Sequence, residues 1–112
     1  MIQREERIGD CRLILGDCLE VMPLLGKVDA VITSPPYDNL RDYGAGFNGV
    51  DLFVAISQIS NALAPGGVCM WNVTDATVKG SETGSSFRQA LHAIDCGLRL
   101  HDTMIYIKDN VN

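Results

Sequence analysis

Short apolar runs alternate with helix-like patterns along the chain. Four of the apolar runs predict strands, at residues 11–15, 28–33, 68–73 and 98–108. The segments between them carry apolar residues at helical spacing, which predicts helices over 18–25, about 52–63 and about 85–96. Strands that alternate with helices are typical of an α/β domain with a largely parallel sheet. Because the run at 28–33 is almost continuously apolar, we expect it to be buried, with helices on both faces of the sheet.

Polar and special residues mark the ends of these elements. Asp51 can cap the second helix, and the sequence Ala-Pro-Gly-Gly at 64–67 is expected to end it. Ser85 or Ser86 is placed to cap the third helix, and Gly97 is expected to stop it. The buried side of that third helix is predicted to carry Phe87, Leu91 and Ile94.

The loops that follow the strands are richer in chemistry than those that follow the helices. They begin at Asp17, Ser34 and Thr74, and residues 38–49 extend the second of them with a run rich in glycine and aspartate. In open α/β sheets, ligands bind at the carboxyl ends of the strands. We therefore expect a binding site where these three loops meet.

The composition sets limits on the kind of protein. A chain of 112 residues with 46% hydrophobic and 21% charged residues suits one modest globular domain over residues 1–112. There is no run of roughly 18 apolar residues that would cross a membrane and no signal peptide, so a cytoplasmic location is the default expectation. The formal net charge of −5 argues against a nonspecific polyanion binder. The four cysteines lack metal-ligand spacing, so we predict free thiols and no metal site.

The sequence Ser34-Pro35-Pro36-Tyr37 ends the second predicted strand in an unusual way. Proline has no N–H group and pushes the residue before it into extended conformations, so Ser34 and Pro35 should be held stiffly. The serine oxygen and the Pro35 carbonyl then form a pair of acceptors, and Tyr37 offers a flat face for stacking. This combination suits a planar ligand with an amino group. A strand that ends in a proline-stiffened turn is the structural alternative.

The stretch "VDAVITSPPYDNLRDYG" resembles the catalytic motif of DNA amino methyltransferases, which use S-adenosylmethionine to methylate N4 of cytosine or N6 of adenine. The similarity extends to "LILGDCLEVMPLL" before the motif, "ISNALAPGGVCMWNV" after it and "GLRLHDTMIYIKDN" at the end. It is closest to the class in which the catalytic motif precedes the cofactor-binding glycine loop, many of whose members come from phages and restriction systems. The resemblance implies a partial Rossmann-like methyltransferase sheet.

The resemblance also implies roles for particular residues. Ser34, Pro35, Pro36 and Tyr37 would hold a flipped target base, with Ser34 and the Pro35 carbonyl on its amino group. Serine in the first position favours cytosine N4 over adenine N6. Gly16, Asp17 and Cys18 would lie at the cofactor, with Asp17 contacting its adenosine part. An ordinary helix cap is the alternative role of Asp17.

The glycine-rich cofactor loop of the family and its target-recognition region do not occur in these residues. The resemblance therefore covers the catalytic half, and it implies that central strands are missing between the first predicted strand and the strand at 28–33. A homo-oligomer, a complementing chain or a longer parent sequence would fill the gap, and most contacts with a DNA substrate would come from the absent region. Two alternatives stay open: an inactive remnant that acts as a binding or assembly module, and an enzyme that methylates amide or amine nitrogen in RNA or protein.

Overall fold

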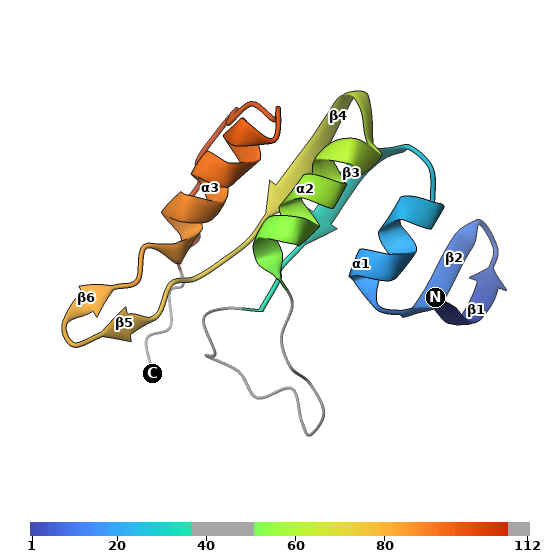
Figure 1. Ribbon diagram of the computed structural model, residues 1–112, viewed down its shortest axis with the longest axis horizontal. Helices are drawn as coiled ribbons and strands as arrows, with labels where there is room; N and C mark the ends of the chain where they lie inside the picture. Colours follow the sequence, from blue (N-terminus) through green and yellow to red (C-terminus); the bar gives the residue numbers. More distant parts are fainter. Residues whose placement is uncertain (37–50, 108–112) are drawn as a thin grey trace.

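The computed structural model describes residues 1–36 and 51–107. Their elements follow one another in Figure 1 as β1 (Ile2–Ile8), β2 (Cys11–Gly16), α1 (Cys18–Val21), the 3₁₀ helix η1 (Met22–Leu24), β3 (Val28–Thr33), α2 (Leu52–Ala62), β4 (Leu63–Trp71), β5 (Thr77–Val78), β6 (Ser81–Glu82) and α3 (Ser85–Asp95). The order of strands and helices from β2 to β4, and the place of α3 after them, agree with the prediction, whereas the β5–β6 hairpin lies in the loop predicted to begin at Thr74. β3 has the predicted bounds, and Pro23 lies where α1 gives way to the 3₁₀ turn.

The described strands form three sheets of two strands each, which corrects the prediction of one largely parallel sheet. β1 pairs with β2 and β5 with β6 in antiparallel hairpins, and β3 with β4 is the parallel pair. β1 is a strand that the sequence pattern did not predict. Gly9 has a positive φ of 58° in the turn between β1 and β2, and this tight turn lets neighbouring segments pair locally. A short loop closes at lower entropic cost than a crossover to β3.

The parallel pair is built from a β3–α2–β4 unit. Its register sets Ala30 opposite Val68 and Thr33 opposite Trp71. Asp51 caps α2 as predicted, because its carboxylate accepts from the amides of Phe53 and Val54. The helix ends at Ala62, and the chain enters β4 at once, so the residues at 64–67 belong to the strand and do not form a separate stop.

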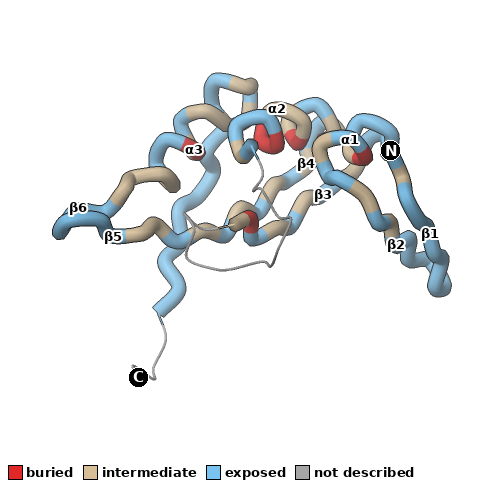
Figure 2. Tube along the Cα trace, turned by 60° about the horizontal axis from the view of Figure 1, so that its bottom comes forward, coloured by how far each residue is buried: buried red, intermediate tan, exposed pale blue. Residues whose placement is uncertain are grey.

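The core of the described residues lies between α2 and its neighbours. Its buried apolar side chains are Val21, Ala55, Ile56, Ile59 and Leu63. Figure 2 shows α1, α2 and α3 on the same side of β3 and β4. Side chains on the opposite face of this pair, including Ile32, Val68 and Met70, are exposed. In the described part of the chain, helices therefore cover one face of the sheet, and the expectation of helices on both faces is wrong there.

The orientation of α3 also differs from the prediction. Phe87, Leu91 and Ile94 are exposed, whereas Gln89 is buried. The side of α3 that packs on α2 carries polar groups, because His92 Nε2 lies 2.9 Å from the Phe53 carbonyl oxygen. Hydrogen bonds to neighbouring elements thus set the rotation of this helix. Its end is as predicted, since Cys96 is the C-cap and Gly97 follows with a φ of 103°.

The predicted strand at 98–108 is not formed in its described part. Residues 98–107 belong to no helix or strand, and their apolar side chains from Met104 to Ile107 are exposed. A strand is stable only when its backbone groups pair with a neighbour, and the alternating pattern by itself supplies none. Within the described ranges, no helix is long and apolar enough to cross a membrane.

Candidate functional site

Ser34, Pro35 and Pro36 lie directly after β3. Ser34 is exposed, Pro35 is buried and Pro36 is half-buried. The residue before them is held by β4, because the Asn72 amide donates to the Thr33 carbonyl at 3.0 Å. Ser34 therefore stands between a paired strand end and a buried proline, which limits its backbone on both sides. Tyr37, which is predicted to stack on the base, lies outside the described residues, and so does the loop at 38–49.

Gly16, Asp17 and Cys18 form the junction between β2 and α1. The Asp17 carboxylate accepts from the Leu19 amide at 2.9 Å, and its carbonyl oxygen accepts from the amides of Glu20 and Val21. Asp17 is thus the N-cap of α1, as the helix-cap interpretation predicted. The side chain is also exposed, and a carboxylate has capacity for further donors.

Gly16 has a steric reason to be glycine. A Cβ at this position would lie 2.7 Å from Val21 Cγ2 and 2.8 Å from the Met1 carbonyl oxygen. Both distances are shorter than real contacts allow, so a side chain would displace α1 or the beginning of β1. The glycine keeps the turn from β2 into α1 tight, and it thereby fixes where Asp17 lies.

The two predicted groups lie at the same edge of the molecule. In Figure 1 the carboxyl ends of β2, β3 and β4 all point to the lower side, as the predicted arrangement of loops requires. No described strand joins the β1–β2 hairpin to the β3–β4 pair. Their helices join them instead: Gln58 Nε2 of α2 donates to the Leu19 carbonyl of α1 at 2.9 Å. The separation between Asp17 and Ser34 therefore depends on the packing of α1 against α2.

The third loop, which begins at Thr74, is hydrogen-bonded to α3. Asp75 accepts from the amide and from the hydroxyl of Ser86, each at 2.8 Å. The N-cap residue itself is Gly84, whose φ is 74°, so the expected serine cap is wrong and an aspartate from the preceding loop takes its place. Because Asp75 satisfies the amide at the start of a helix, its place in the structure is that of a cap.

Sequence reasoning missed two residues that organise this edge, Gln58 and Gln89. Gln89 is buried, and its Oε1 accepts from Trp71 Nε1 at 2.9 Å. A glutamine in an amphipathic helix ordinarily predicts a solvent-facing position, so the pattern gave no signal for either residue.

The acidic groups and the thiols at and near this edge do not form a metal centre. In the ranges 1–36 and 51–107, no group of three or more His, Cys, Asp or Glu side chains could hold a metal ion. Cys69 lies on the helix-covered side of β4, and burial raises the pKa of its thiol. Among the described residues, Ser34 and Asp17 offer exposed oxygen acceptors at this edge.

Comparison with known proteins shows similarity to methyltransferases. The chain is 44% identical over 109 residues to the orphan methyltransferase M.BamHII of Bacillus amyloliquefaciens, which covers 96% of this chain and 34% of that protein. It is 32% identical over 91 residues to the type II methyltransferase M.SmaI of Serratia marcescens, covering 70% of this chain and 31% of that protein. The type II beta methyltransferase M.BslI of Bacillus sp. (strain NEB-606) is 35% identical over 75 residues.

The similarity to the first of these proteins extends over nearly the whole chain, so it includes both Asp17 and Ser34 in its range. The chain spans about a third of the length of the first two relatives. No family model matches the chain, and no solved structure matches it.

Proposed function

We propose that this chain is the part of an S-adenosylmethionine-dependent DNA methyltransferase that holds the target base, with cytosine N4 favoured over adenine N6. The observation that carries the proposal is the placement of Ser34 and Pro35 at the carboxyl end of a parallel strand, in a chain 44% identical to a methyltransferase over 96% of its length. The fold we propose is a partial Rossmann-like sheet, of which β3 and β4 are neighbouring strands. A DNA substrate also favours a cytoplasmic location.

The chemistry proposed for Ser34 follows from the nature of an aromatic amino group. The lone pair of that nitrogen is delocalised into the ring, which makes it a poor nucleophile. Two acceptors, the Ser34 oxygen and the Pro35 carbonyl, would hold its hydrogens and favour a pyramidal nitrogen with a localised lone pair. Because the neighbouring backbone is held by the Thr33–Asn72 hydrogen bond and by buried Pro35, these acceptors need little reorganisation at the moment of reaction.

The cofactor would supply a methyl group on a positively charged sulfur. The residues proposed to hold it are Gly16, Asp17 and Cys18, and their geometry fits that role in one respect: the exposed Asp17 carboxylate is oriented by its own hydrogen bond to Leu19. A carboxylate that caps a helix through one oxygen can still accept from the hydroxyl groups of an adenosine. Asp17 would then bind and orient the cofactor without taking part in proton transfer.

The sheets that lead to Asp17 and to Ser34 each have a strand edge to which a further strand could pair. Each sheet of the described residues has two strands, so β2 and β3 each pair on one side within those residues. We propose that a complementing chain or a longer parent sequence supplies parallel strands between β2 and β3, together with the glycine-rich cofactor loop and most of the surface that contacts DNA, whereas a second copy of this chain would supply strands alone. The chain would then act as the catalytic half of the domain. By itself, we expect no detectable methyl transfer and at most weak cofactor binding, and tight one-to-one binding in isothermal titration would contradict this.

A chimera tests the function. The matching third of the Bacillus amyloliquefaciens methyltransferase is replaced by this chain, and transfer of a radioactive methyl group is measured with DNA, RNA and protein as substrates. We expect label in DNA and, on nucleoside analysis, N4-methylcytosine. Label found only in RNA or protein would show that the DNA assignment is wrong. A chimera that folds and binds cofactor but labels nothing would favour an inactive remnant.

Ser34→Ala in the same chimera tests the mechanism. Loss of one hydrogen bond made in the transition state is worth roughly 3 kcal/mol, so turnover should fall by about a hundredfold while cofactor affinity stays unchanged. Ser81→Ala is the matched control, because Ser81 is exposed in the β5–β6 hairpin and its hydroxyl bonds to the neighbouring Glu82 carbonyl. Equal activity of the Ser34 and Ser81 variants would remove the serine oxygen from the mechanism.

A further inference from the structure

The end of β4 and the loop after it are each hydrogen-bonded to α3. Trp71 Nε1 donates to Gln89 Oε1 at 2.9 Å, and Asp75 accepts twice from Ser86 at 2.8 Å. Gln89 is 7% exposed and is the buried polar residue of the described part of the chain. Burying an amide costs free energy unless it is hydrogen-bonded, so the Trp71–Gln89 bond is needed to keep this side chain inside.

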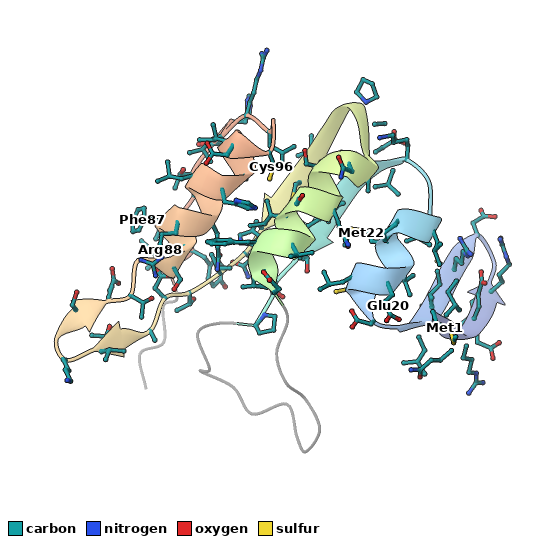
Figure 3. The ribbon with its side chains drawn as sticks, in the orientation of Figure 1. Met1, Glu20, Met22, Phe87, Arg88 and Cys96 are labelled. Carbon is teal, nitrogen blue, oxygen red and sulfur yellow. The ribbon has the colours of Figure 1, made fainter. Side chains whose placement is uncertain are left out.

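α3 is itself held on α2 at its C-terminal end. Near its end, Ser60 Oγ donates to the Cys96 carbonyl oxygen at 2.8 Å, and Figure 3 shows Cys96 on the side of α3 that faces α2. One turn earlier, the rings of Phe53 and His92 lie 4.6 Å apart. α3 is therefore a firm support for the loop that it holds.

The hydrogen bonds to α3 are linked to Ser34 through the pairing of β3 with β4. Trp71 is paired with Thr33 in the parallel ladder, and the next residue, Asn72, donates its amide to the Thr33 carbonyl at 3.0 Å. This bond is made at the residue immediately before Ser34. A rotation of the Trp71 side chain would move the end of β4 and, with it, the backbone that carries Ser34.

We propose that Gln89 is a positioning residue for the target base, acting through Trp71 and Asn72 on Ser34. The inference rests on the proposed function, because it assigns to Gln89 the task of keeping the base acceptors in place. Gln89 does not touch the base in this arrangement. Its amide oxygen fixes the indole, the indole fixes the end of β4, and β4 fixes the start of the Ser34 loop.

The test compares Gln89→Met with Gln89→Glu in the chimera described above, which keeps the rest of the Bacillus amyloliquefaciens protein. Methionine keeps the approximate length of the side chain but removes the acceptor, whereas glutamate keeps an acceptor oxygen at the same position. Gln3→Met is the matched control, because Gln3 lies exposed on β1. Two quantities are measured for each variant: the rate of amide hydrogen exchange at Asn72, and the affinity for short single-stranded DNAs with one cytosine or one adenine among thymines, relative to a strand of thymines alone.

We expect Gln89→Met to speed exchange at Asn72 by about tenfold, the size expected when one hydrogen bond is lost, and to weaken cytosine-selective binding several-fold. Gln89→Glu should restore most of both, and Gln3→Met should change neither. If Gln89→Met does not fold, Trp71→Phe breaks the same bond from the other side and should give the same losses.

The outcomes separate this inference from the proposed function. A chimera with Gln89 that binds the cytosine or adenine strand selectively, with Gln89→Met unchanged in affinity, overturns the positioning role alone. Faster exchange at Asn72 with unchanged selectivity also overturns it, because the bond would then be merely structural. A chimera with Gln89 that has no preference for cytosine or adenine over thymine counts against the proposed base pocket itself, and the positioning role fails with it.

Discussion

Replacing Ile59 by alanine tests whether α2 holds the described fold together. α2 packs against α1, η1, α3 and β4, and Ile59, at 3% exposed, is the most buried of its side chains. The substitution removes carbon atoms equivalent to about three methylenes, which at about 0.8 kcal/mol each amounts to about 2.4 kcal/mol. The cavity left behind adds to this, so we expect a loss of about 3 kcal/mol in the free energy of unfolding.

The size of that loss matters because few residues form the core. Domains of this length are typically stable by about 5–15 kcal/mol, and the short list of buried apolar side chains favours the lower end of the range. Ile59→Ala should thus remove about half of the stability. Ile94→Ala is the matched control: it makes the same chemical change on α3, where the side chain is 44% exposed, and should cost less than about 1 kcal/mol.

Urea unfolding measures both variants. Trp71 is the single tryptophan of the chain, so its fluorescence reports on β4, while far-ultraviolet circular dichroism reports on the helices. Both signals should give the same shifted midpoint for Ile59→Ala, with an unchanged slope against urea. Equal losses for the two isoleucine variants, or a cost below about 1 kcal/mol at Ile59, would show that α2 is not the centre of the core.

Three further predictions concern particular side chains. Gly16→Ala should destabilise the chain by about 1–3 kcal/mol in the same urea assay, because the added Cβ overlaps neighbouring atoms at 2.7 and 2.8 Å; an unchanged midpoint would show that the turn has room. Cys69 should react more slowly with iodoacetamide at mildly alkaline pH than exposed Cys11, because burial raises the pKa of the Cys69 thiol and the thiolate is the reactive form; equal rates by mass spectrometry would refute this. The hydrogen bond from Arg12 lowers the pKa of the Glu5 carboxyl, so this pair stabilises the β1–β2 hairpin above the ordinary glutamate pKa and the stabilisation is lost as the pH falls through the lowered value. Glu5→Gln should therefore flatten the dependence of stability on acidic pH, and an unaltered pH profile would contradict the pairing.

The local elements were largely predictable from the sequence. The strand at 28–33 has the predicted bounds, Asp51 caps α2, and Gly97 follows the end of α3. These features depend on residues close in the chain: the apolar run, the capping carboxylate and the glycine at a positive φ. The position of Ser34 at a strand end followed from the same kind of evidence, and so did the cap at Asp17.

The tertiary structure decided which strands pair and which side of each helix is buried. The sequence pattern predicted one parallel sheet, but a tight turn at Gly9 gave β2 an antiparallel partner in β1. Likewise, helical spacing identified the apolar stripe that contains Leu91, but it could not tell that α3 would turn Gln89 inward toward Trp71. A helix pattern shows which side is apolar, and only the neighbours that meet it determine which side is covered.

The sequence by itself determined that the backbone is restricted at Ser34, because a serine followed by two prolines limits its own backbone wherever it stands. The supports of that site came only from the tertiary structure. Gln58 joins α1 to α2, Gln89 holds the end of β4, and Asp75 caps a helix from eleven residues before Ser86. These are hydrogen bonds between residues distant in the chain, and their partners are set by how the helices pack and not by any local pattern.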